Sequence, residues 1–120
     1  MSAQKSGREQ QLFGSFASAA VRRGKEFYFD RALAMQFLDR CDIDDFAVIG
    51  IEGFRITPTA TEPDMTLIAD YSGRLITGEW GQIKRACNTD ARQFVRAAPE
   101  GAFFNFVVSS SDERDSDCAS

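Results

Sequence analysis

The chain contains no histidine among its 120 residues. Histidine is the usual general base near neutral pH and the commonest nitrogen ligand of protein metal sites. Its absence excludes Ser-His-Asp and Cys-His nucleophile activation, and with them imidazole ligation of a metal. The glycine patterns GxGxxG and GxxxxGKS/T are also missing, which excludes the common phosphate-binding loops. We therefore predict a protein that is not an enzyme and binds no cofactor.

Cysteine is scarce and its three positions lie far apart in the sequence. Cys41, Cys87 and Cys118 form no CxxC pair. This spacing predicts free thiols in a reducing compartment, and neither a disulfide framework nor a zinc site. Cys41 and Cys87 fall on the apolar stripes of predicted helices, so we expect inert core thiols at both positions, whereas Cys118 is expected to be exposed.

No apolar run approaches the roughly 20 residues that a helix needs to cross a bilayer. The stretch from Leu12 to Val21 is interrupted by Gly14, Ser15 and Ser18, and is too polar for a signal-peptide core. We expect a cytoplasmic protein that does not contact membranes. The 18 acidic residues against 14 basic ones give a net charge of −4. That balance argues against nucleic acid as a direct partner.

Hydrophobic residues make up 43% of the chain and include 11 phenylalanines, enough for a single core at this length. Asp30 is suited to cap a helix over residues 31–41, because its carboxylate can accept a free amide of the first turn. The apolar residues of that helix recur at i, i+3, i+4 and i+7 at Ala34, Phe37, Leu38 and Cys41. The same period predicts a second helix over residues 82–98.

The strand signals are β-branched and aromatic residues in short runs bounded by turn residues. They predict strands at residues 26–29, 46–56, 65–69 and 102–108, with a loop at 57–63. The strand at 102–108 is apolar on both faces, which predicts a central position in the sheet.

This element order predicts an α+β fold: a two-layer sandwich with two main helices packed on one face of a mostly antiparallel three- to four-stranded sheet. A ferredoxin-like split βαβ arrangement is compatible with the order. We expect a single domain at residues 25–108, preceded by a partly disordered extension at 1–24 that contains a short helix within 9–21. A disordered tail is expected at 109–120.

Two carboxylates, Glu52 and Asp70, lie on the strands predicted to form a hairpin. If they face one another across the hairpin, they could transfer protons or hold a divalent cation. In the alternative arrangement Glu52 faces solvent, while Asp70 caps the turn at Tyr71 and Ser72 through its side chain.

An acidic cluster of Asp42, Asp44 and Asp45 follows the first predicted helix. Negative charge is unfavourable at a helix C-terminus, which suggests either retention for a partner or an ordinary aspartate-rich turn. Trp80, next to Glu79, could anchor an interface or fill the space between sheet and helix.

Four segments carry a resemblance to a known class of proteins. They are the helix AMQFLDRC at 34–41, the strand IGIEGF at 49–54, the strand end LIADYS at 67–72, and ARQFV at 91–95 before the last aromatic strand. In these segments, residues 26–108 resemble small bacterial immunity proteins of polymorphic toxin systems.

The resemblance implies a cytoplasmic, non-enzymatic protein that binds one toxin domain tightly. Many toxins are basic nucleases, and an acidic inhibitor associates with such a partner faster through electrostatic steering. On this hypothesis the partner-binding surface draws on seven residues: Asp42, Asp44, Asp45, Glu52, Asp70, Glu79 and Trp80.

Two other classes of function remain open on the sequence. One is a small enzyme or a ligand- or metal-binding domain that uses Glu52 and Asp70. The other is an adaptor subunit that self-associates through an edge strand or a phenylalanine-rich surface.

Overall fold

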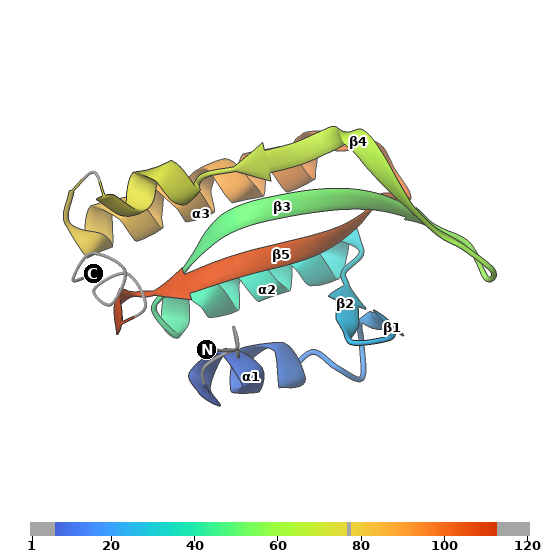
Figure 1. Cartoon of the computed structure of the whole chain (residues 1–120), viewed down its shortest axis with the longest axis horizontal. Helices are drawn as coiled ribbons and strands as arrows, with labels where there is room; N and C mark the ends of the chain where they lie inside the picture. Colours follow the sequence, from blue (N-terminus) through green and yellow to red (C-terminus); the bar gives the residue numbers. More distant parts are fainter. Residues whose placement is uncertain (1–6, 77, 113–120) are drawn as a thin grey trace, which may run out of the picture.

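Figure 1 shows a long two-stranded hairpin in the main sheet and two long helices behind that sheet. The computed structural model describes residues 7–76 and 78–112. In chain order its elements are α1 (Gly7–Gly14), β1 (Val21–Arg23), β2 (Glu26–Tyr28), α2 (Arg31–Ile43), β3 (Phe46–Ile56), β4 (Thr61–Asp70), the 3-10 helix η1 (Ser72–Ile76), α3 (Trp80–Ala97) and β5 (Phe103–Ser110). No helix in these described residues is long and apolar enough to span a membrane.

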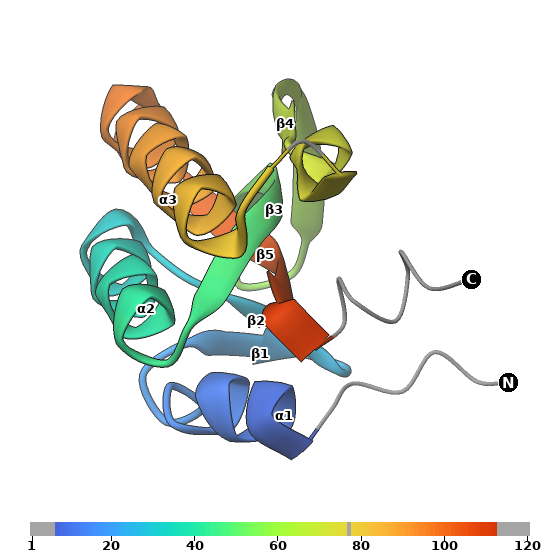
Figure 2. The same ribbon diagram turned by 90° about the vertical axis from the view of Figure 1, so that its left-hand side faces the viewer.

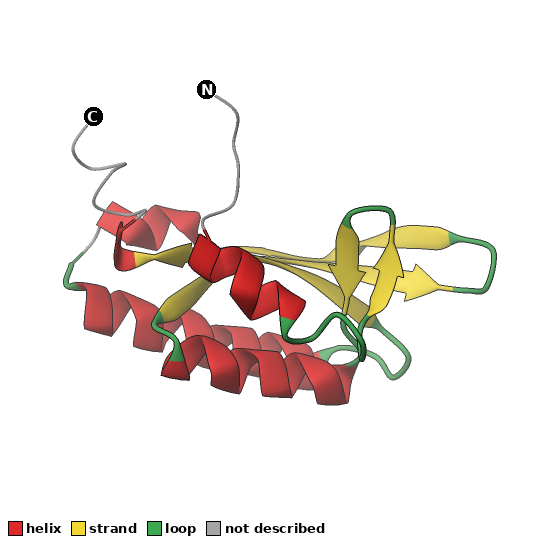
Figure 3. Ribbon diagram, turned by 90° about the horizontal axis from the view of Figure 1, so that it is seen from below, coloured by secondary structure: helices red, strands yellow, loops and turns green. Residues whose placement is uncertain are grey.

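The main sheet is antiparallel with strand order β4-β3-β5, and β1 pairs with β2 in a separate hairpin. An isolated bridge between Phe29 and Phe104 joins the end of β2 to the free edge of β5. The helices α2 and α3 lie side by side on one face of the main sheet (Figures 2 and 3). This arrangement confirms the predicted α+β sandwich.

The strand order refines the predicted topology. Helix α2 connects β2 to β3, and β5 lies between these two strands. Helix α3 connects β4 to β5, and β3 lies between them, so the split βαβ arrangement is present. The central hydrogen-bonded strand is β3, however, and β5 has only the Phe29 bridge on its second edge. A ferredoxin-like sheet would instead place the strand before the first helix at its centre. The central position predicted for β5 is wrong. It was based on apolar residues on both faces of the strand, but Val107 on the outward face has half of its surface exposed to solvent.

The core is built from phenylalanines that α2, β2, β3 and β5 contribute. Phe37 of α2 stacks on Phe106 with 4.9 Å between ring centres, and Phe29 lies 4.8 Å from the same ring of Phe37. Helix α1 adds Leu12 and Phe13, both nearly inaccessible to solvent. Residues 7–14, expected in an extension outside the domain, therefore pack into its core. The disordered tail expected at 109–120 starts too early, because Ser109 and Ser110 are buried and belong to β5. The disorder expected for residues 1–6 and 113–120, and the exposure expected for Cys118, lie outside the described residues.

Helix α2 begins after Asp30, as predicted, since the Asp30 carboxylate accepts the backbone N–H of Leu33 at 2.8 Å.

The segment predicted as a loop at 57–63 has a different structure. The turn closes within Thr57–Ala60, and β4 begins at Thr61 and includes Pro63. A proline is tolerated there because β4 is an edge strand, and the missing N–H can face away from β3.

Candidate functional site

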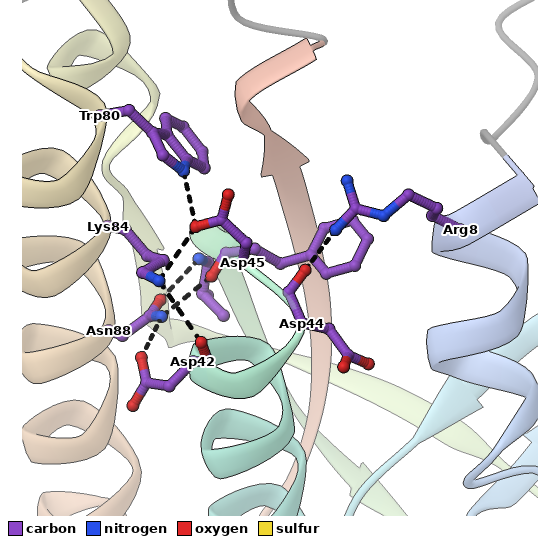
Figure 4. Close-up of polar contacts among 9 residues, drawn as sticks. Arg8, Asp42, Asp44, Asp45, Trp80, Lys84 and Asn88 are labelled. Atoms are coloured by element: carbon purple, nitrogen blue, oxygen red, sulfur yellow. Dashed lines mark hydrogen bonds and ion pairs between the residues drawn. The ribbon is translucent and has the colours of Figure 1, made fainter.

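The aspartates at the end of α2 lie in a polar corner between α2, α3 and the start of β3 (Figure 4). Asp42 accepts a hydrogen bond from the Asn88 amide at 2.7 Å and a second from the Arg92 guanidinium. Asp44 pairs with Arg40, one helical turn earlier, at 3.0 Å. Both carboxylates are therefore engaged within the chain.

Asp45 occupies the first position after the cap of α2, with a left-handed backbone (φ 65°) that aspartate tolerates better than most residues. Its Oδ1 atom accepts hydrogen bonds from Trp80 Nε1 and Lys84 Nζ, each at 3.0 Å. Trp80 is half-buried at the start of α3, so the structure gives it a packing role with a satisfied N–H. Glu79, just before it, is exposed and makes no capping hydrogen bond.

The electrostatics of the corner follow from these contacts. Partial burial raises the pKa of Asp42, but hydrogen bonds from Asn88 and Arg92 outweigh it and hold the pKa below its ordinary value. Asp45 follows the same pattern: burial raises its pKa, and the hydrogen bonds from Lys84 and Trp80 lower it further than burial raises it. Two of the three aspartates that the sequence suggested for a partner, Asp42 and Asp45, thus form an ionised link between the end of α2 and α3.

Asn88 is a structural residue of this corner that sequence reasoning missed. It is fully buried, donates to the carbonyl of Phe46 at 3.0 Å and accepts the N–H of Val48 at 2.8 Å. These two backbone groups lie beyond the end of β4, so the Asn88 amide takes the place of a neighbouring strand. The sequence did offer one indication of this role: Asn88 follows Cys87 in the interior of a helix, where asparagine is unfavourable.

Glu52 and Asp70 both project from the sheet face that α2 and α3 leave uncovered. Glu52 is paired with Ile68 and Asp70 with Gly50, so the two carboxylates are diagonal neighbours and do not face one another directly. Asp70 Oδ1 accepts the backbone N–H and the hydroxyl of Ser72 at 2.9 and 2.6 Å, and these bonds lower its pKa. Asp70 therefore caps its turn, the alternative that the sequence left open.

A shallow hollow of about 290 Å³ lies on this open face, over β3 and between the outward side chains of β4 and β5. We call it the sheet-face hollow. Its outward-facing residues are Gly50, Glu52, Ile68, Asp70, Ser72 and Val107. Ile68 of β4 is 48% exposed and Val107 of β5 is 51% exposed. The hollow thus combines exposed apolar walls with two carboxylates.

Beyond the hollow, the open face continues towards β2 with further acidic character. Tyr28 packs edge-on against Phe54 with 4.9 Å between ring centres. Burial raises the pKa of Tyr28, and the nearby charges of Glu26 and Glu52 raise it further. Asn105 of β5 donates to the Glu26 carboxylate at 3.0 Å. Glu26 and Glu52 therefore act together on this part of the open face, and Arg23 opposes them by lowering the pKa of Tyr28.

Neither metal ligation nor thiol nucleophilicity has a matching arrangement of side chains in the described residues 7–76 and 78–112. These residues contain no group of three or more acidic or cysteine side chains that could hold a metal ion. Cys41 and Cys87 are fully buried, as predicted, and burial raises the pKa of both thiols. Neither thiol is poised to act as a nucleophile.

Comparisons with protein-family models, with curated proteins and with solved structures give no match for this chain.

Proposed function

We propose that this protein is a non-enzymatic binding domain that neutralises a toxin domain, and that the partner docks on the open face of the sheet. The observation that carries the proposal is the sheet-face hollow, where Ile68 and Val107 are exposed beside the carboxylates of Glu52 and Asp70. Apolar residues at the centre of a patch with charged residues around them are typical of protein interfaces.

The location differs from the one expected on the acidic cluster alone. Asp42 and Asp45 are occupied by Lys84, Asn88 and Arg92, so a partner would have to displace internal bonds to use them. Glu52, by contrast, makes no hydrogen bond or ion pair within the described residues. We therefore retain Glu52 and Asp70 as partner-binding residues and assign the acidic cluster to stability.

The chemistry of the face favours a basic partner. The residues that line the hollow include two carboxylates and no lysine or arginine. A basic toxin domain would be attracted to this surface, whereas a second copy of this chain would bring like charges together. Self-association through the outer edge of β4 is also disfavoured by Pro63 and by the irregular pairing near Gly53.

Growth rescue tests the toxin-neutralising function directly. Wild-type protein would be used to capture partners, and each captured protein would be expressed alone and together with this chain. We expect a captured domain that arrests growth when expressed alone, with growth restored by co-expression of the wild type. The Ile68→Asp variant should fail to restore growth, and the Glu79→Gln variant should restore it.

Two results would contradict the proposal. One is that no captured protein is toxic, so that there is nothing to neutralise. The other is that Ile68→Asp rescues growth as well as the wild type while its expression level is equal, which would place the interface elsewhere.

A further inference from the structure

We infer that the sheet-face hollow is a socket for one arginine side chain of the protein partner. This inference rests on the proposed function in one respect: the partner is a protein. It goes further by naming the group that is recognised, a guanidinium on an aliphatic stem, and the residues of this chain that recognise it.

The shape of the hollow depends on Gly50. Its position in β3 lies between Asp70 of β4 and Val107 of β5, and it carries no side chain to fill the gap between those strands. A Cβ atom built at Gly50 would lie 3.4 Å from the Cβ atom of Val107, which is ordinary contact. The floor of the hollow is therefore backbone, and even one methyl group would reduce its depth without straining the sheet.

The walls suit the apolar part of an arginine side chain. Ile68 and Val107 stand on either side of the floor, and each leaves about half of its surface exposed. Arginine commonly lays its three methylene groups along such apolar surface while its charged head reaches a polar edge. A wholly apolar side chain would cover the same walls but would leave the two carboxylates beside it desolvated without a partner.

The carboxylates are placed for a guanidinium. Glu52 and Asp70 are diagonal neighbours across β3 and β4, a relation that separates side-chain positions by roughly 7–8 Å. A planar guanidinium with five N–H donors can lie between them and donate to both, whereas an ammonium acts as a point charge. Asp70 lines the hollow, and Ser72 binds only its Oδ1 atom, so Oδ2 has no donor in the described residues and is available to a guanidinium.

The contrast with the polar corner at the end of α2 strengthens the assignment. There, Asp42 and Asp45 are already paired with Arg92 and Lys84 of the same chain. The sheet-face hollow offers the same kind of carboxylate without an internal cation among its lining residues. The missing cation is what a partner would supply.

The experiment is a titration of the ¹⁵N-labelled protein with single amino-acid derivatives, followed by two-dimensional NMR. N-acetyl-arginine amide is the probe, and the lysine and leucine analogues are compared with it. We expect the arginine derivative to shift the amide signals of Gly50 and Val107 saturably, with a dissociation constant on the order of 1–10 mM. The lysine derivative should bind about threefold more weakly or worse, and the leucine derivative should not saturate.

Variants of this chain make the test specific. Glu52→Gln and Asp70→Asn should each weaken binding of the arginine derivative by about 3- to 10-fold, because each removes one charge-assisted contact. Gly50→Ala should abolish the saturable shifts by filling the floor. Glu62→Gln removes a carboxylate from β4 outside the hollow and should change nothing, which makes it the matched control.

Three outcomes would overturn the assignment: equal binding of the leucine derivative, equal binding of the lysine derivative, or unchanged arginine binding in both Glu52→Gln and Asp70→Asn. The socket and the proposed function fail separately. If growth is rescued but the arginine derivative does not bind, the proposed interface is supported and the arginine site is refuted. If the arginine derivative binds but no toxin is neutralised, the arginine site is supported and the proposed toxin-neutralising function is refuted.

Discussion

At the scale of single residues, Asn88 shows how one side chain can replace part of a strand. It binds the carbonyl of Phe46 and the N–H of Val48 where β4 has ended, and it also contacts Asp42. Buried backbone groups without such a partner are costly, so the residue couples the start of β3 to α3. The polar corner is therefore explained by stability, without a partner.

Replacing Asn88 with alanine should lower the free energy of unfolding by about 2–4 kcal/mol, because it leaves two buried backbone groups unsatisfied. The measurement is urea unfolding followed by circular dichroism. Gln93→Ala, at an exposed position of the same helix, is the control and should cost less than about 0.5 kcal/mol. Equal effects of the two substitutions would contradict the role assigned to Asn88.

The acidic corner also predicts a pH dependence. The pKa of Asp42 is lower in the folded protein than its ordinary value of 3.8. A group with a lowered folded pKa contributes stability above its unfolded pKa and loses it as the pH falls through the folded pKa. The stability difference between the wild type and Asp42→Asn should therefore be largest near neutral pH and shrink below about pH 4. Urea midpoints measured at several pH values test this, and a difference that grows in acid would contradict it.

At the scale of elements, the hairpin of β3 and β4 is shaped by a register shift beside Gly53. Glu52 pairs with Ile68, but the next residue, Gly53, pairs with Asp64, so three residues of β4 bulge out between those pairs. Leu67 lies in this bulge and packs directly over Gly53. The bulge reshapes β4 where an unbroken edge could pair with other chains.

The close approach predicts a clear difference between two glycines of the same strand. A Cβ atom at Gly53 would lie 2.4 Å from the Cβ atom of Leu67. The backbone of β4 would have to move to relieve this overlap. Gly53→Ala should therefore destabilise the protein by about 1–3 kcal/mol in thermal or urea unfolding. Gly50→Ala, with its nearest contact at 3.4 Å, should be nearly neutral, and a cost equal to that of Gly53→Ala would contradict this account.

Helix α1 provides the other test at this scale. Phe13 lies 5.1 Å from Phe37 between ring centres, in the same core as the sheet. Phe13→Ala should cost about 3–5 kcal/mol, a large part of the stability of a domain of this size. Gln11→Ala, on the exposed side of α1, should have little effect. A negligible cost for Phe13→Ala would show that α1 is an accessory segment, as the sequence suggested.

The elements with strong local signals were predictable from the sequence. The helix after Asp30 has a cap and a regular apolar stripe, and α3 has the same stripe, so both were found nearly to their ends. Strand pairing was harder, because the order of β3 and β5 depends on contacts between residues far apart in the chain. The role of Asn88 and the diagonal placement of Glu52 and Asp70 depend on register, which local patterns do not determine.

At the scale of the whole molecule, the two faces of the sheet are unequal. One is covered by α2 and α3, and its phenylalanine core holds the layers together. Among the described residues, α1, α2 and α3 all leave the other face uncovered, and that face carries Ile68 and Val107 exposed beside Glu52 and Asp70. The corner at Asp42 and Asp45 links α2 to α3 and supports the fold. Under the proposed function, the open face is the surface that binds the partner, so stability and binding depend on different residues.

The affinity of a captured, growth-arresting partner for two variants tests that separation most directly. Titration calorimetry would compare Ile68→Asp, on the open face, with Asp45→Asn, in the polar corner, after both are shown to be folded. We expect Ile68→Asp to weaken binding about 10-fold or more, whereas Asp45→Asn should change it less than about threefold. The reverse pattern would place the partner on the acidic corner and contradict the account.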